Sequence, residues 1–140
     1  MHYIEIERIW TDGDEMVQLD IGASNGNQSG KQDFYIYPGE FILFAKKLQK
    51  FPVNIKDEVK VEYGIPPSYY CYLCLGAIVI DKVGHSAFMF KFSNRLAIPN
   101  LAEMLFYMKS EPATINEFSK KLEAWATKMD GRFRFEWESA

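Results

Sequence analysis

The sequence predicts an α+β domain made of two β-β-β-α-β units, and three observations lead to this prediction. Residues 44–64 align with residues 118–138 without a gap, at a constant offset of 74 positions. Each half of the chain carries short segments that alternate apolar and polar residues between turn residues, which is typical of strands. Each half also carries one longer segment with apolar residues at helical spacing. Short turns join antiparallel neighbours, so we expect mainly antiparallel sheet with two packed helices.

The repeat defines the expected domain organisation. Its identical pairs are Phe44/Phe118, Lys46/Lys120, Lys47/Lys121, Leu48/Leu122 and Glu62/Glu136. Internal repeats constrain the whole fold, because each copy forms an equivalent unit. We therefore expect a single domain over residues 1–140, with one unit in residues 1–65 and the other in residues 66–140, joined near Gly64. An approximate twofold axis should relate the two helices.

The first half predicts strands at residues 3–10, 16–21, 32–37 and 58–63, with a turn at residues 12–15. Pro38 begins the helix, at a position where its missing N–H group is harmless. Apolar residues then recur at helical spacing, and Pro52 ends the segment.

The second half predicts strands at residues 68–80 and 85–92. Residues 101–108 fit either a strand or a helix, and we interpret them as a strand because Phe106 occupies the place of Phe34. A capping box of Thr114 and Glu117 predicts the start of the second helix, and Gly131 predicts its left-handed end. The last strand is expected at residues 132–138.

Composition limits the function classes. The chain has 140 residues and a net charge of −3, which argues against non-specific nucleic-acid binding. Its longest apolar run is shorter than the roughly 20 residues of a membrane span, and no signal peptide is visible. Two cysteines do not make a disulfide framework. We therefore expect a cytoplasmic protein that binds neither nucleic acid nor membrane.

Two motifs resemble sites of cofactor or metal chemistry. Cys71 and Cys74 have the C-x-x-C spacing, but they lie in a strand-like run, where residues three apart point to opposite faces. A zinc site would need further ligands that the chain does not group. Residues 26–31 approach a phosphate-binding loop but lack its first Gly and its Ser or Thr. Both are interpreted as structural, so no cofactor is expected.

Two other groups have the residue types of a catalytic or metal site. His85, Ser86 and Asp81 contain the types of a hydrolytic triad, but successive residues of a strand point apart. The acidic residues of the turn at 12–15, with Asp81, lack the spacing of a calcium-binding loop and fit hairpin turns. We therefore predict no catalytic and no metal-binding residue.

Surface residues remain as candidates for binding. Both helices carry lysines on their outer faces, as solvated helices usually do. Aromatic residues make up 16% of the chain, and tyrosine is enriched at protein interfaces. The candidate partner-binding residues are Tyr35, Tyr37, Tyr70, Tyr72 and His85.

A family resemblance adds an expectation about function. Residues 33–38, Phe44, Leu48, residues 57–59, Asp81 with His85, and Ile115 with Trp125 resemble a family of small bacterial proteins of unknown function. Such domains are similar to the immunity proteins that neutralise cell-wall-associated polymorphic toxins. The resemblance implies a non-catalytic, protein-binding role with a toxin as partner. A second copy of the chain is the other protein partner that we consider. A small-molecule-binding domain or small enzyme, with a site near His85, stays open as the alternative.

Overall fold

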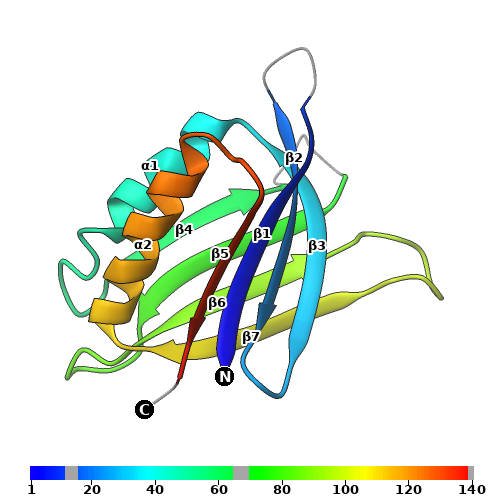
Figure 1. The fold of residues 1–140 in the computed structure, drawn as a ribbon. Helices are drawn as coiled ribbons and strands as arrows, with labels where there is room; N and C mark the ends of the chain where they lie inside the picture. The colour runs from blue at the N-terminus through cyan, green and yellow to red at the C-terminus, as the bar shows by residue number, and fades with distance from the viewer. Residues whose placement is uncertain (12–15, 65–69, 139–140) are drawn as a thin grey trace.

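The computed structural model describes residues 1–11, 16–64 and 70–138, which form two antiparallel four-stranded sheets and two helices (Figure 1). In chain order the elements are β1 (His2–Thr11), β2 (Val17–Ser24), β3 (Ser29–Ile36), α1 (Pro38–Leu48), β4 (Glu58–Tyr63), β5 (Tyr72–Val79), β6 (Ser86–Ser93), β7 (Glu103–Ser110), α2 (Pro112–Ala126) and β8 (Arg132–Trp137). The predicted α+β class and the two β-β-β-α-β units are confirmed.

The two units exchange their last strands. Sheet A has the order β3-β2-β1-β8, and sheet B has the order β4-β5-β6-β7. β8 of the second unit therefore completes the sheet of the first unit, where Phe135 lies opposite Ile4. β4 of the first unit completes the sheet of the second, where Val61 lies opposite Leu75. Each sheet thus contains strands from both units.

The bounds of the elements show how far the repeat extends. β3 and β7, α1 and α2, and β4 and β8 each begin 74 residues apart, whereas β2 and β6 begin 69 residues apart. Gln49 Nε2 donates a hydrogen bond to Glu123 Oε1 at 2.8 Å, and these two residues are themselves 74 positions apart. A contact between equivalent residues lies close to the axis that relates the units. The approximate twofold axis therefore passes between the helices.

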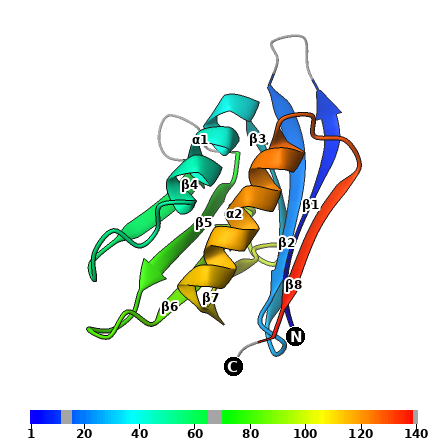
Figure 2. The same ribbon diagram turned by 60° about the vertical axis from the view of Figure 1, so that its left-hand side comes forward.

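The helices lie side by side and run in opposite directions (Figure 2). Asn116, in the second turn of α2, donates hydrogen bonds to the carbonyl oxygens of Leu48 at 3.0 Å and Phe51 at 2.9 Å, at the end of α1. These bonds satisfy carbonyls that the end of a helix leaves without intrahelical partners. Leu48 and the equivalent Leu122 are both fully buried. One hydrophobic cluster contains residues of both helices and both sheets.

The predicted capping box of the second helix is wrong. α2 begins at Pro112, two residues before Thr114, and none of the described side chains caps its first turn. A proline at the first helical position has φ already fixed near the helical value, and it lacks an N–H group that would need a partner. Pro38 begins α1 in the same way, at the equivalent position.

The end of α2 also differs from the prediction. The helix ends at Ala126 with Thr127 in a right-handed conformation. Gly131 does have a left-handed φ of 67°, but it lies in the connection to β8, as does Met129 with a φ of 54°. The left-handed residues therefore turn the chain after the helix has ended.

The strand interpretation of residues 101–108 is confirmed by β7, although its alignment within the repeat shifts. β3 and β7 begin 74 residues apart, so Met108, and not Phe106, is equivalent to Phe34. Side-chain direction repeats every two residues in a strand, so a shift of two leaves the buried face unchanged. Phe106 and Met108 are accordingly both buried. The turn predicted at residues 12–15 and the junction after Gly64 lie outside the described residues.

Candidate functional site

The two cysteines are free and buried. Cys71 directly precedes β5 and Cys74 lies within it, so their side chains point to opposite faces of the strand. Cys71 belongs to the hydrophobic cluster, and its thiol donates a hydrogen bond to the carbonyl oxygen of Asp33 at 3.2 Å. Burial raises the pKa of Cys71 to about 11 and also raises the pKa of Cys74. Reactive thiols have lowered pKa values, so both residues fit the structural interpretation.

His85 and Asp81 meet across a turn, a contact that the sequence pattern did not predict. Asp81 Oδ2 lies 2.5 Å from His85 Nδ1, and Asp81 Oδ1 accepts the backbone N–H of His85 at 3.1 Å. The bond to His85 lowers the pKa of the Asp81 carboxyl. Ser86, however, is buried, and its hydroxyl donates to the carbonyl of Ser110 at 2.5 Å. The serine is therefore engaged elsewhere, and the Asp81–His85 pair organises a turn.

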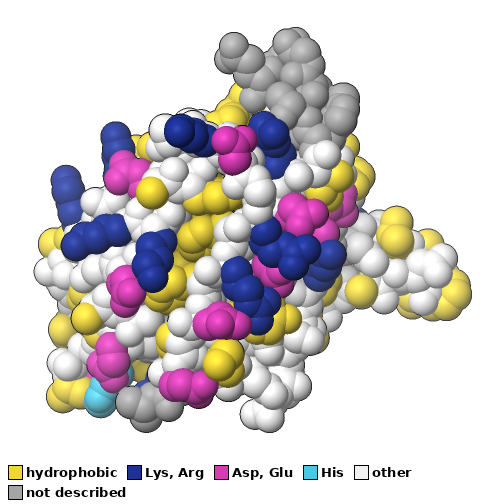
Figure 3. All heavy atoms as spheres, in the orientation of Figure 1, with side chains coloured by type: hydrophobic (Ala, Val, Ile, Leu, Met, Phe, Trp, Pro, Cys, Tyr) yellow, Lys and Arg dark blue, Asp and Glu magenta, His cyan; other side chains and the backbone are white. Residues whose placement is uncertain are grey.

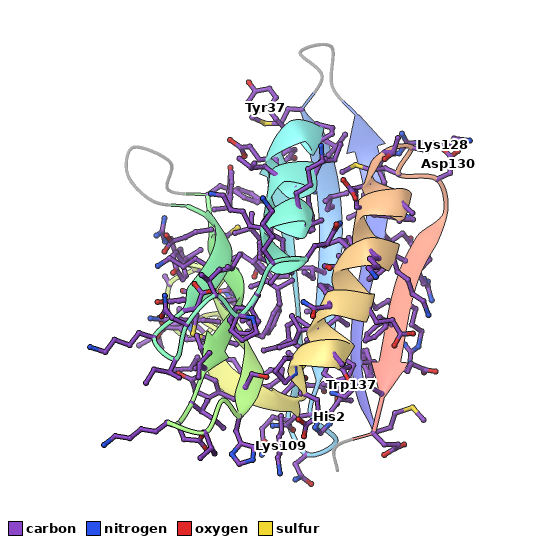
Figure 4. The ribbon with its side chains drawn as sticks, turned by 90° about the vertical axis from the view of Figure 1, so that its left-hand side faces the viewer. His2, Tyr37, Lys109, Lys128, Asp130 and Trp137 are labelled. Carbon is purple, nitrogen blue, oxygen red and sulfur yellow. The ribbon has the colours of Figure 1, made fainter. Side chains whose placement is uncertain are left out.

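The predicted tyrosines are distributed over several surfaces. Tyr35 and Tyr70 form an edge-to-face pair with ring centroids 5.5 Å apart, and the Tyr70 hydroxyl donates to Asp33 Oδ2 at 2.5 Å. This bond raises the pKa of Tyr70. Tyr37 precedes α1 and lies at the opposite end of the molecule from His2 and Trp137 (Figure 4). Tyr72 lies in β5, on the outer face of sheet B. Only Tyr35 and Tyr70, among the predicted residues, touch one another in the described contacts.

The most prominent exposed apolar segment connects β6 to β7. We call residues 94–102 the arm, since they extend from the body of the molecule (Figure 1). Three large apolar side chains on the arm are exposed to water: Leu96 at 54%, Ile98 at 84% and Leu101 at 40%. Leu105 and Tyr107, on the adjoining strand β7, are also exposed. Figure 3 shows hydrophobic side chains on this extension.

A single asparagine organises the base of the arm. Asn94 Oδ1 accepts the backbone N–H groups of Leu96 at 3.1 Å and Ala102 at 3.0 Å. Its Nδ2 donates to the carbonyl of Asn100 at 3.0 Å, and its backbone N–H donates to the carbonyl of Ala102 at 3.0 Å. The arm is therefore held in a defined conformation by polar contacts at its base, while its apolar side chains stay free of the core.

The turn between β2 and β3 uses the same hydrogen bonds. Asn25 Oδ1 accepts the backbone N–H groups of Asn27 at 2.9 Å and Gln28 at 2.8 Å, and the N–H of Asn25 donates to the carbonyl of Gln28 at 3.0 Å. In each hairpin the serine that ends the preceding strand accepts an N–H two residues later: Ser24 from Gly26 at 3.1 Å, and Ser93 from Arg95 at 3.2 Å. The two hairpins are therefore equivalent.

This equivalence shows that the middle of the arm is an insertion. Residues 24–27 correspond to residues 93–96 at an offset of 69, whereas Gln28 corresponds to Ala102 at an offset of 74. Residues 97–101 have no counterpart in the first unit. The second unit thus carries five additional residues, and Ile98 and Leu101 are among them.

The arm is fixed to the body through Arg95. This residue has a left-handed φ of 55°, and its Nη2 donates to the carbonyl of Gly64 at 2.6 Å. Its guanidinium also lies 5.9 Å from the centre of the Tyr72 ring. Next to this anchor, Tyr72, Lys91, Arg95 and Leu105 line an open hollow of about 740 Å³, with Phe92, Ser93, Glu103 and Met104. The hollow extends the surface of the arm onto the outer face of sheet B.

A second hollow, of about 420 Å³, lies on the outer face of sheet A. Its cations are paired with carboxylates: Arg132 contacts Glu5 at 2.7 Å and Glu7 at 2.9 Å, and Lys31 contacts Asp20 at 2.7 Å. Figure 3 shows basic and acidic side chains interleaved on the face of the molecule that it presents. The charges of this hollow are therefore satisfied by one another.

The described residues hold no group of three or more side chains suited to binding a metal ion. None of the helices in the described part of the chain has the length and apolar character that a transmembrane span requires.

No protein-family model matches the chain, and none of the curated proteins compared with it matches. The solved structure of the plant transcriptional regulator PBF-2 is similar, with a TM-score of 0.50 and 13% sequence identity. The similarity covers 90% of this chain and 74% of that one. At this identity the similarity concerns the fold alone, and the resemblance to immunity proteins stays a prediction.

Proposed function

We propose that the chain is a non-catalytic protein-binding domain and that the arm is its principal binding element. The observation that carries this proposal is the five-residue insertion 97–101, which adds exposed apolar side chains to a hairpin whose counterpart is short and polar. Clustered apolar side chains at the surface do not stabilise a monomer, and they are typical of interaction sites. The hollow at the base of the arm enlarges the available contact area.

The order of the arm supports the same function. A binding loop that is already fixed in one conformation loses less conformational entropy when a partner binds. Asn94 and Arg95 fix the arm through contacts that involve none of its apolar side chains. Ile98, with Leu96 and Leu101, is therefore available to serve as an apolar anchor in a pocket of the partner.

The partner class that the family resemblance implies is a bacterial toxin, which makes this chain a cytoplasmic immunity protein. Two free and buried cysteines fit a reducing compartment. Binding through an apolar element needs no catalytic group on this chain, so the proposal does not depend on the Asp81–His85 pair.

Site-specific photo-crosslinking in the source cells tests the proposal. A photoreactive residue at position 98 should capture a second protein, whereas the same residue at position 27, in the equivalent hairpin, should not. The captured protein is then purified, and its affinity for the unmodified chain is measured. We expect Ile98→Ser with Leu101→Ser to weaken binding by about 30-fold or more, since central apolar anchors carry most of the energy of an interface.

A matched control uses exposed apolar residues away from the arm. Val53→Ser with Ile55→Ser changes side chains that are exposed at 75% and 53%, and should leave the affinity unchanged. Equal capture at positions 98 and 27, or equal loss of affinity in the two double variants, would show that the arm is not the binding element. Co-expression with a toxin encoded beside this chain tests the immunity role separately.

A further inference from the structure

The four edge strands of the two sheets differ in how their free edges are covered. On β7, the carbonyl of Tyr107 accepts Asn25 Nδ2 at 3.2 Å, and the carbonyl of Lys109 accepts Trp137 Nε1 at 3.0 Å. On β3, the carbonyl of Asp33 accepts the Cys71 thiol. At the end of β4, Gly64 accepts Arg95. These contacts engage backbone groups that an unprotected edge would offer to another chain.

β8 is different. It pairs with β1 on one side, and none of the hydrogen bonds found between described residues reaches the backbone of Arg132–Trp137 from the other side. Figure 2 shows this strand at the margin of the molecule. An exposed edge strand with unpaired N–H and C=O groups can pair with a strand of another molecule.

The charges along β8 and the residue after it are arranged in two blocks. The side chains that face away from the core are Arg132, Arg134, Glu136 and Glu138, which read as two cations followed by two anions. The side chains between them, Phe133, Phe135 and Trp137, are buried on the core side. An antiparallel partner presents the same strand in the reverse order, so two cations then lie opposite two anions.

We propose that β8 pairs with β8 of a second copy of this chain, antiparallel and centred on Phe135. In this register Arg134 lies opposite Glu136 of the second copy, and Arg132 lies opposite Glu138 of the second copy. Each of the four cross-strand pairs around the dyad joins opposite charges, which stabilises an antiparallel ladder. The two sheets A join into one eight-stranded sheet with twofold symmetry, which is the commonest symmetry of homodimers.

The intramolecular contacts of these side chains are compatible with this pairing. Arg134 contacts Glu136 at 2.8 Å and Glu5 at 2.9 Å, and the side chains of Arg134 and Glu136 are still 41% and 44% exposed. Because each charge already has an opposite neighbour in its own copy, the edge is close to neutral and does not repel a second copy. The pairing buries a small area, so we expect a reversible dimer whose population depends on concentration.

The equivalent strand β4 has only part of this self-complementarity, although it occupies the same place in the other sheet. In an antiparallel pairing centred on Val61, the equivalent of Phe135, Lys60 would lie opposite Glu62. The outer position is different, because Glu58 would lie opposite Gly64, whose carbonyl is bonded to Arg95. β4 therefore provides the matched control, because its edge is engaged at Gly64 and Lys60 is equivalent to Arg134 at the offset of 74.

Sedimentation of the full chain at concentrations up to about 1 mM tests the dimer. Arg134→Glu places two carboxylates opposite each other across the dyad, and Glu136→Arg places two guanidinium groups opposite each other. We expect each single variant to weaken dimerisation by about tenfold or more, and the double variant R134E/E136R to restore it, since opposite charges again face each other. Lys60→Glu should leave dimerisation unchanged. Thermal unfolding of each variant confirms that it is folded.

Hydrogen exchange provides a second readout in the unmodified chain. Amides of β8 should become more protected as the concentration rises, whereas amides of β4 should not. A chain that stays monomeric at about 1 mM, a dimer unaffected by R134E, or a dimer weakened equally by K60E would each overturn the proposal. The arm does not take part in this contact, so loss of the dimer leaves the proposed function of the arm standing.

Discussion

The two hairpins that connect β2 to β3 and β6 to β7 share one hydrogen-bond scheme but present different surfaces. Asn25 closes a four-residue turn of polar residues, whereas Asn94 closes an arm of nine residues with exposed apolar side chains. The common scheme shows that both are versions of the same structural unit. The five additional residues 97–101 show where the two units differ, and we place function at that point.

This difference also separates stability from binding. Burial of apolar surface stabilises a fold by about 25 cal/mol per Å², and a side chain left in water contributes none of this. Ile98 is 84% exposed, so the fold does not depend on it. Substitutions in the shared core, in contrast, should lower the free energy of unfolding by similar amounts in both units.

The largest effect is expected in that shared core. Phe44→Ala and Phe118→Ala remove equivalent, buried rings, and Phe118 contacts Phe88 at a centroid distance of 4.9 Å. Each substitution should lower the free energy of unfolding by about 3–5 kcal/mol, through lost burial and the cavity that remains. Chemical denaturation measures both values. A large loss at one site and almost none at the other would break the equivalence of the two units.

A smaller effect is expected at the asparagines that organise the hairpins. Asn25→Ala and Asn94→Ala each remove the acceptor of two backbone N–H bonds, so each should cost about 1–2 kcal/mol. Only Asn94→Ala should also increase hydrogen exchange in residues 96–102. Unchanged exchange in the arm would mean that Asn94 does not hold it.

The pH dependence of stability should report on His2. Its Nδ1 is buried and has no hydrogen-bond partner among the described residues, and burial lowers the pKa of His2 below 6.5. The unfolded chain therefore binds a proton at a higher pH than the folded chain. The stabilising contribution of neutral His2, fully present above pH 6.5, is lost as the pH falls toward the lower folded pKa. His2→Leu should reduce this loss between about pH 7 and pH 5, as measured by denaturation at each pH, and an unchanged slope would contradict the assignment.

The position of His2 sharpens the comparison of the units. Tyr3 pairs with Ser24 as Tyr72 pairs with Ser93, so His2 is equivalent to Cys71. Both are buried groups that stay neutral near pH 7, since burial lowers the pKa of His2 and raises that of Cys71 to about 11. Acid should thus destabilise the first unit through His2, whereas only strong alkali should destabilise the second unit through Cys71.

The smallest effect is expected on the exposed faces of the helices. Lys46→Ala and Lys120→Ala change equivalent side chains that face water, so each should alter the free energy of unfolding by no more than about 0.5 kcal/mol. Denaturation under the conditions used for the phenylalanine variants measures this. Losses as large as those at Phe44 and Phe118 would mean that the helices face the other way.

Much of the fold could be predicted from the sequence because its pattern is local. The apolar stripes of both helices, and the alternation in the strands, follow from side-chain geometry within a few residues. The exchange of β4 and β8 could not be predicted, since a closing strand such as Val59–Val61 has the same alternation whichever sheet it joins. Pro112 was detectable, because it lies 74 residues after Pro38, the same offset that relates the two helices.

The candidate site was harder to predict than the fold. Tyrosines are informative by composition, but sequence does not show that Tyr37 and Tyr72 lie on different surfaces. The sequence pattern does not reveal the arm, because residues 93–100 have no periodicity and read as an irregular segment. Its signal is the repeated Ser–Asn pair, Ser24–Asn25 and Ser93–Asn94, which aligns the two hairpins only when five residues are inserted.

Deletion of residues 97–101 tests the central claim most directly, because it converts the arm into the turn found in the first unit. The affinity for the crosslinked partner is measured together with the free energy of unfolding. We predict that the unfolding free energy changes by no more than about 1 kcal/mol, as for surface changes, and that binding weakens by about 30-fold or more. A deletion variant that still binds its partner with unchanged affinity, or that no longer folds, would contradict the claim that the insertion is a binding element added to a symmetric scaffold.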